Sequence, residues 1–196
     1  MVNELIRKNR SYRRFDGSHK VSDSILFELV NNARLSSSAA NLQPLRYMIV
    51  NSAEKAQAVY DTVKWAAYLP DWAGPKVDER PSSYIVILGD KSYPNYHYID
   101  AGIAVQSILL SAVEKGLGGC IFASTDKAKL REELDIDVDL EVILVLAIGK
   151  SSEKVILTEL PPGGDVKYWR DDSDIHYVPK RKLEDIIVAT FSERNE

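Results

Sequence analysis

The chain has 196 residues, of which 45% are apolar and 28% are charged, a composition typical of one folded domain and not of a disordered chain. The net charge of −4 argues against a nucleic-acid-binding protein, which usually carries a basic face. The single cysteine, Cys120, excludes an internal disulfide and fits a reducing compartment.

Neither a membrane span nor a signal peptide is predicted. No apolar run reaches the roughly 20 residues that cross a bilayer, and the residues before Leu5 lack the basic and apolar regions of a signal peptide. We therefore expect a single cytoplasmic domain over residues 1–196, with no membrane partner and no nucleic-acid partner.

The first predicted elements are a short amphipathic helix over residues 2–9 and the basic segment that follows it, Arg10-Ser11-Tyr12-Arg13-Arg14-Phe15. Arginine presents a planar fork of donors that fits phosphate oxygens, and a serine hydroxyl adds a donor at short range. The segment therefore has the composition of half an anion site. An ordinary solvated turn explains the same residues, because short basic motifs often occur by chance.

A helix with one apolar face is predicted over residues 23–35, with Ser22 as its N-cap. It leads into a row of small polar residues, Ser36-Ser37-Ser38-Ala39-Ala40-Asn41-Leu42-Gln43-Pro44. Hydroxyls and carboxamides in such a row can bind the amide-like edge of a heterocycle, although a plain connector is the simpler explanation. Pro44 stops the helix, and a buried strand is predicted at residues 47–50.

The middle of the chain alternates helices and strands. A helix is predicted over residues 53–63 and a strand over residues 84–89, with an aromatic and proline-rich stretch, Trp65 to Pro81, between them. That stretch could cover a planar ligand or form a packed surface loop, and the residues favour neither. The helix over residues 99–115 is apolar on almost every side, which indicates burial within the domain or against another subunit and so points to a dimer.

The glycines of Gly116-Leu117-Gly118-Gly119 follow this helix, whereas a Rossmann glycine loop follows a strand and opens a helix. They are interpreted as a helix C-cap and a tight crossing between helix and strand. A further helix, capped by Ser124 or Thr125, is predicted to run through Leu134. The continuous apolar run over residues 141–148 predicts a central strand.

The C-terminal part is less regular. A turn-rich connection at residues 161–164 precedes a second basic cluster, Lys180-Arg181-Lys182. The apolar residues 183–191 could dock as an arm, either in this subunit or across an interface.

No side chain of the sequence is arranged for chemistry of its own. Cys120 begins an apolar strand, where a buried and inert thiol is expected. His19, His97 and His176 show no metal-ligand spacing, and neither a nucleophile elbow nor a phosphate-binding glycine loop is present. An enzyme with this sequence would need a cofactor to carry the reaction, and no metal site is predicted.

Taken together, the motifs resemble the nitroreductase family of oxidoreductases, which use flavin mononucleotide (FMN). The resemblance extends over nearly the whole chain, from about residue 4 to about residue 188. Its motifs, in chain order, are Arg10 to Phe15, the Ser38-Asn41-Gln43-Pro44 pattern, Asp100-Ala101-Gly102-Ile103-Ala104, Gly116 to Cys120, and Lys180-Arg181. Each motif alone is weak, but five in the same order are specific.

This resemblance implies an α+β fold, a three-layer sandwich in which helices flank a mostly antiparallel sheet. It also implies a homodimer with FMN at the subunit interface and a C-terminal arm over residues 176–196. The residues that would bind the FMN phosphate are Arg10, Ser11, Arg13, Lys180 and Arg181, with Lys182 almost as well placed. Those that would meet the flavin ring are Ser37, Ser38 and Asn41 of the partner subunit, and Ala123 and Ser124 near the reactive N5.

The resemblance further implies a two-step exchange, in which NADH or NADPH delivers hydride to flavin N5 and an acceptor such as a nitroaromatic, a quinone or another flavin then takes the electrons. No catalytic side chain is assigned. The sequence departs from the family pattern at Ser37, Leu45 and Ala123-Ser124, so the acceptor is left open. An FMN-binding sensor, store or partner-binding module would carry the same motifs. A third alternative is a relative that destroys flavin or removes halogen.

Overall fold

An antiparallel four-stranded sheet forms the centre of the protein, in a computed structural model that describes residues 1–93 and 96–192. Its strand order is β1-β2-β4-β3, and its strands are β1 (Leu45–Val50), β2 (Ser83–Asp90), β4 (Leu140–Gly149) and β3 (Gly118–Phe122). The inner strands β2 and β4 are buried along most of their length because helices cover both faces. The predicted central position of residues 141–148 is therefore confirmed.

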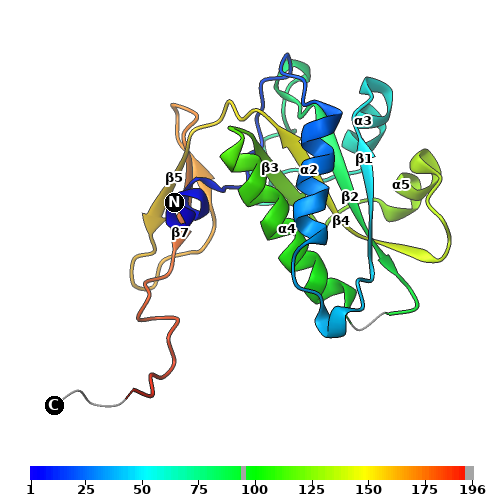
Figure 1. Cartoon of the computed structure of the whole chain (residues 1–196). Coiled ribbons are helices and arrows are strands. Elements are labelled where there is room, and N and C mark those ends of the chain that lie inside the picture. The colour runs from blue at the N-terminus through cyan, green and yellow to red at the C-terminus, as the bar shows by residue number, and fades with distance from the viewer. Residues whose placement is uncertain (94–95, 193–196) are drawn as a thin grey trace.

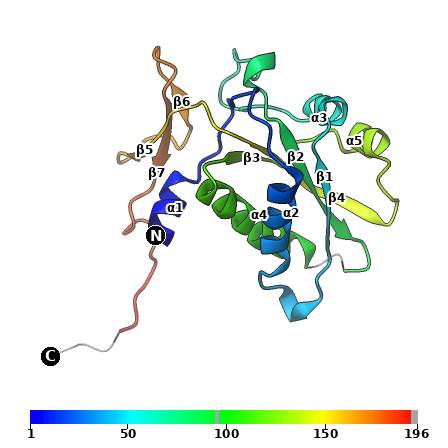
Figure 2. The same ribbon diagram turned by 45° about the horizontal axis from the view of Figure 1, so that its top comes forward.

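Two pairs of helices enclose this sheet and make three layers (Figure 2). The first face carries α2 (Asp23–Arg34) and α4 (His97–Glu114), which pack with the sheet in one apolar cluster. The opposite face carries α3 (Ala53–Tyr60) and α5 (Lys127–Leu134), and the buried ring of Phe15 joins their cluster. The predicted α+β sandwich with an antiparallel sheet is confirmed.

The basic segment is an extended strip that runs along the sheet and is not a solvated turn. It leaves α1 (Val2–Lys8), and Ser11 then forms a parallel bridge with Gly119 of β3. Phe15, which is 1% exposed, forms a bridge with Ser151 just after β4. These two anchors fix the backbone on either side of Arg13.

One of the two predicted helix N-caps is found in the structure and the other is not. The Ser22 hydroxyl accepts a hydrogen bond from the Ile25 N–H, as an N-cap does. The N-cap of α5 is Asp126, whose carboxylate accepts from Lys129 N–H, so the prediction of Ser124 or Thr125 is wrong. Thr125 instead pairs with Val63 in an isolated bridge. The helix predicted over residues 53–63 ends at Tyr60, and α4 begins at His97, before the predicted residue 99.

A second, three-stranded sheet lies beside the sandwich and was missed by the sequence (Figure 1). Its order is β5-β7-β6, with β5 (Val155–Glu159) parallel to β7 (His176–Lys180) and β6 (Trp169–Arg170) antiparallel to it. The first residues of the predicted arm are therefore β7. Residues 181–192 then extend away from the body with Leu183, Ile186, Val188 and Phe191 exposed, and residues 193–196 lie outside the described part.

The aromatic stretch from Trp65 to Pro81, which contains the 3₁₀ turn η2 (Val77–Glu79), is packed onto the protein. The Trp65 ring meets Phe122 edge to face at 4.7 Å and lies 6.4 Å from Trp72, measured between ring centroids. These contacts support a packed loop.

Helix α4 is only partly covered within this subunit. Ala104 and Ile108 are buried against the sheet, while Ile99 and Ile103 are 62% and 38% exposed. The second subunit that this open apolar face predicts stays a prediction. Within residues 1–93 and 96–192, no helix is long and apolar enough to cross a membrane.

Glycine at position 119 is required by two close contacts, one with the backbone of β4 and one with Leu109 of α4. A methyl group there would lie 2.6 Å from the Ala147 carbonyl oxygen and 2.6 Å from Leu109 Cδ2. We expect Gly119→Ala to lower the free energy of unfolding by about 1–3 kcal/mol, the usual cost of overpacking. Gly102→Ala is the control, because its methyl would meet no described atom within 4 Å apart from its own chain neighbours and the backbone of its helix. Urea unfolding measures both, and equal effects would contradict the close approach.

Candidate functional site

Four of the predicted phosphate residues surround one cavity. Arg10, Ser11, Arg13 and Lys180 line a space of about 330 Å³ between the N-terminal strip, α4, β3 and β7. Leu109, Ile121 and Val178 supply apolar walls. We call this space the anion cavity, since three cationic side chains and one hydroxyl converge on it.

Arg10 lines this cavity and is held in place through its Nη2. Its Nη2 donates to the Ile6 carbonyl at 2.8 Å, but its buried Nε has no acceptor among the described residues. Burial lowers the pKa of this guanidinium, as expected for a cation without a carboxylate beside it. Because Nε itself is buried, an anion in the cavity would be bound through the terminal nitrogens of this guanidinium.

Arg14, the third arginine of the strip, does not line the cavity. Its Nη2 lies 3.0 Å from Asp174 Oδ1 and its Nε 3.7 Å from Glu79 Oε2. Because side chains alternate along an extended strip, Arg13 and Arg14 leave it in different directions. The basic cluster of the sequence is thus divided between a site and a pair of surface ion pairs.

Arg13 is held from several sides. Its Nη1 donates to the Ser11 carbonyl at 3.2 Å and contacts His176 Nε2 at 3.1 Å. Its guanidinium carbon lies 4.4 Å from the centre of the Tyr168 ring, within the range of a cation–π interaction. Burial, together with the nearby Arg13 and Arg170 charges, lowers the pKa of His176 to about 4 against the opposing influence of Glu153, so the imidazole is neutral at pH 7.

A buried carboxylate, Glu153, lies beneath this group. Its Oε2 accepts from the Arg13 backbone N–H at 2.7 Å and its Oε1 from Arg170 Nη2 at 2.6 Å. The side chain is 1% exposed, so Arg170 supplies the countercharge that burial demands. Sequence reasoning assigned no role in the site to Glu153, Tyr168 or Arg170, and found of His176 only that it has no metal-ligand spacing. No local pattern distinguishes them, because the small sheet brings them together.

A second cavity, of about 150 Å³, adjoins the first. Ala123 and Ser124 line it together with Lys64, Ala66 and Ala67, and it shares Arg13, Ile121 and Tyr168 with the anion cavity. The Ser124 carbonyl accepts from Lys64 N–H at 3.2 Å, which holds this rim in place. The anion cavity and the cavity lined by Ala123 and Ser124 are therefore neighbours that share a wall of three residues, Arg13, Ile121 and Tyr168. The aromatic loop contributes to the edge of the second cavity through Ala66 and Ala67.

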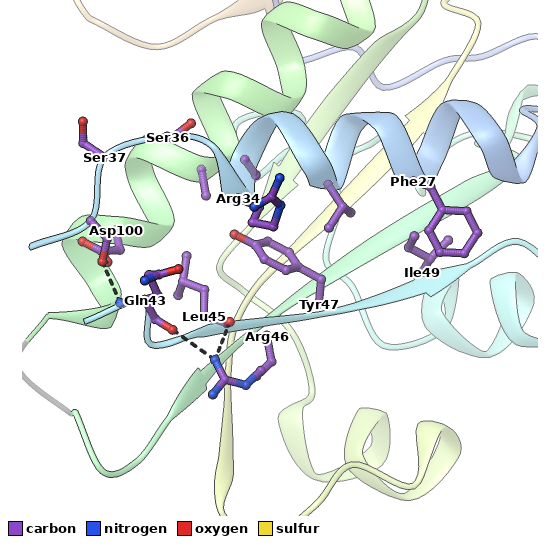
Figure 3. Close-up of a pocket in the computed structure, with 14 residues that line it drawn as sticks. Phe27, Arg34, Ser36, Ser37, Gln43, Leu45, Arg46, Tyr47, Ile49 and Asp100 are labelled. Atoms are coloured by element: carbon purple, nitrogen blue, oxygen red, sulfur yellow. Dashed lines mark hydrogen bonds between the residues drawn. The ribbon is translucent and has the colours of Figure 1, made fainter. Parts of the chain in front are cut away.

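Ser37 and Ser38 line a third and larger cavity, of about 420 Å³, between α2 and β1 (Figure 3). Its walls are mainly apolar, with Phe27, Leu45, Tyr47 and Ile49 among them. None of the residues that line it lines the anion cavity. Within one subunit, the two groups of predicted flavin residues are apart.

The loop that carries Ser37 and Ser38 has a strained backbone and is held in place by hydrogen bonds. Three of its non-glycine residues have positive φ: Ala40 at 48°, Asn41 at 56° and Gln43 at 50°, a conformation that costs energy. Buried Asp100 of α4 compensates, accepting from Ser38 Oγ at 2.5 Å and from Ala39 N–H at 3.1 Å. Ser38 Oγ also accepts from Gln43 N–H at 2.9 Å. The Ser38 hydroxyl thus shapes the loop, and Asn41 does not line the large cavity.

Only one residue of the C-terminal basic cluster lines the anion cavity. Lys180 lines the anion cavity, whereas Arg181 and Lys182 are not among its lining residues. Lys182 Nζ lies 3.1 Å from Glu159 Oε1 of β5. Lys180, as the last residue of β7, is on the rigid part of this segment.

Cys120 is the buried thiol that the sequence predicts. It is 3% exposed, and burial raises its pKa to about 11, so the sulfur is protonated at neutral pH. A protonated, inaccessible thiol is a poor nucleophile. In the described residues no three His, Cys, Asp or Glu side chains gather as a metal site.

Comparison with known proteins agrees with this geometry. A family model described as the nitroreductase family matches residues 6–150, which include the N-terminal strip, the strained loop and the whole central sheet. This chain belongs to the nitroreductase family. The resemblance found in the sequence motifs is thereby confirmed.

Individual relatives are distant in sequence. A protein of Archaeoglobus fulgidus provisionally named an NADH dehydrogenase/NAD(P)H nitroreductase is 26% identical over 74% of this chain and 83% of its own length. An iodotyrosine deiodinase of Thermotoga neapolitana is 24% identical over 76% and 88%. The solved structure of a Staphylococcus epidermidis protein, provisionally named an NAD(P)H:FMN oxidoreductase, matches with a TM-score of 0.72 at 17% identity over 97% and 96%. That last likeness supports the nitroreductase fold.

Proposed function

We propose that the chain is an FMN-dependent oxidoreductase that takes hydride from NADH or NADPH and passes the electrons to a small-molecule acceptor. Membership of the nitroreductase family supports oxidoreductase chemistry. The observation that carries the proposal is the adjacency of two cavities, one lined by Arg10, Ser11, Arg13 and Lys180 and the other by Ala123 and Ser124, with Arg13, Ile121 and Tyr168 common to both.

The anion cavity fits a phosphate monoester, which carries nearly two negative charges at neutral pH. Arg10, Arg13 and Lys180 would neutralise it, and the Ser11 hydroxyl would add a short neutral donor. Arg181 stays a candidate only if residues after β7 change position.

The flavin ring would extend from this cavity over Ile121, which is 42% exposed at the junction of the two cavities. An apolar side chain beneath a planar heterocycle excludes water from that face. The Ala123-Ser124 backbone would then lie beside the reactive edge. When bound, FMN would supply the chemistry that the protein's side chains lack, accepting hydride from the nicotinamide and giving electrons to the acceptor.

A homodimer would complete the site. The strained loop with Ser37, Ser38 and Asn41 lies apart from the anion cavity of its own subunit, so we assign it to the FMN of the partner subunit. Exposed apolar residues on α4 and on residues 181–192 offer surfaces for such an assembly. Burial of these residues would favour association.

The acceptor is a small molecule that can stack over the same flavin face. Nitroaromatics, quinones and free flavins remain the leading classes, and the deiodinase relative adds halogenated aromatics to the set to be tested. A flavin-holding module without turnover would use the same residues.

Anaerobic reduction separates the enzyme from that module. We expect the purified protein to be yellow with FMN and its visible flavin absorbance to bleach rapidly when NADH or NADPH is added. Adding each acceptor class in turn should restore the colour for the true substrate class. A spectrum unchanged by both nucleotides, with FMN bound, would favour the non-enzymatic module, and a protein that binds no FMN would refute the proposal.

Lys180 and Lys182 make a matched pair for the phosphate assignment. We expect Lys180→Ala to weaken FMN binding by about 1.5–3 kcal/mol, the range for a hydrogen bond to a charged group. Lys182→Ala should change it by less than about 0.5 kcal/mol, because its partner is the surface carboxylate of Glu159. Fluorescence titration with FMN measures both, and the reverse order would place the phosphate at residue 182.

Ile103 on the open face of α4 tests the dimer. We expect wild-type protein to sediment as two subunits, and Ile103→Glu to sediment as one and to lose FMN, since a buried charge disfavours the interface. Val138→Glu is the control, because Val138 is 72% exposed in the connection between α5 and β4. A flavin-replete monomer would contradict the shared site.

A further inference from the structure

The imidazole of His176 lies under the anion cavity with a defined proton arrangement. Arg13 Nη1 is 3.1 Å from His176 Nε2. A guanidinium has only donors, so Nε2 must accept, and the ring is neutral with its proton on Nδ1. The low pKa that burial gives His176 agrees with this state. The ring is 0% exposed and is therefore not itself a ligand of anything in the cavity.

This contact decides which part of the Arg13 guanidinium remains available. Nη1 is occupied by the Ser11 carbonyl at 3.2 Å and by His176, and the Tyr168 ring covers a face at 4.4 Å. In the described residues, no acceptor contacts Arg13 Nε or Nη2. These two nitrogens form one edge of the guanidinium, the edge that can bind two oxygens of a phosphate at once.

Among the described residues, only Arg13 contacts His176 Nε2 within hydrogen-bond distance. Glu153 Oε1 lies 3.9 Å from His176 Nδ1, beyond hydrogen-bond distance, so the buried Nδ1–H has no acceptor among these residues, and Glu153 itself contacts Arg170 and the Arg13 backbone. The Tyr168 ring packs on the imidazole at 5.0 Å between centroids. His176 therefore has one polar contact that reaches the anion cavity, and it passes through Arg13.

We propose that His176 is a positioning residue for phosphate recognition: by accepting the Nη1–H of Arg13 it leaves the Nε–Nη2 edge free to bind the phosphate of FMN in a bidentate manner. This inference rests on the proposed function. It assigns a role to a side chain that touches neither cofactor nor substrate.

Two substitutions at position 176 and two ligands test it. His176→Leu keeps an apolar side chain of similar bulk without an acceptor, whereas His176→Gln retains a carbonyl oxygen that can accept from Arg13. We expect the Leu variant to bind FMN at least about tenfold more weakly than wild type, as the loss of a charge-assisted contact implies, and the Gln variant to stay within about threefold. Riboflavin, which lacks the phosphate, should bind all three proteins with nearly equal affinity.

The outcomes separate a positioning role from a merely structural one. If the Leu variant loses FMN and riboflavin affinity equally, or loses neither, the inference is wrong. If wild-type protein binds FMN no better than riboflavin, the phosphate site itself is wrong, and the proposed function fails before this inference is reached.

A measurement on the unaltered protein covers the case in which the Leu variant does not fold. The chain has three histidines, so ¹⁵N NMR of ring-labelled protein can be assigned with His176→Gln as reference. We expect a bare Nε2 and a protonated Nδ1 for His176 at neutral pH before FMN is added. A proton on Nε2 would overturn the inference even in a protein that binds FMN.

Discussion

The carboxylate of Glu153 lies where the N-terminal strip, the end of the central sheet and the small sheet meet. It accepts from the Arg13 backbone and from Arg170 while almost wholly buried. A buried ion pair adds little net stability, but removing one partner leaves an uncompensated charge, at a cost of about 3–5 kcal/mol. The small sheet is thereby fixed against the sandwich, and the anion cavity exists only because both contribute walls to it.

Much of this architecture follows from local pattern. The continuous apolar run of β4 requires covered faces, and the helical spacing after Ser22 requires one buried side, so these elements could be predicted from the residues. Their assembly into a three-layer sandwich was implied by the family resemblance. The small sheet could not be predicted, because the parallel pairing of β5 with β7 joins segments whose own sequences are short and unremarkable. The Asp126 cap was missed for a similar reason: Thr125 is taken up by a bridge to Val63 from another part of the chain.

For the site, the residue types indicated the chemistry, but the contacts between side chains could not be predicted from the sequence. The basic segments could be recognised from their chemistry, and the family resemblance selected Arg10, Arg13 and Lys180 from them. The fold gives the physical reason, because Arg14 and Lys182 are paired with Asp174 and Glu159. His176 carries no motif at all. The left-handed backbone at Ala40, Asn41 and Gln43 could not be predicted either, since none of these residues is a glycine, the residue that usually indicates this conformation.

The exposure of the segment after β7 affects how readily proteases can cleave the chain. Residues 181–192 leave the body with apolar side chains in solvent, and exposed segments of this kind are where proteases cut first. Val188 and Phe191 are both almost fully accessible, so this segment is open to proteases unless another surface covers it. Protection of the segment from limited digestion would therefore report that such a surface has bound.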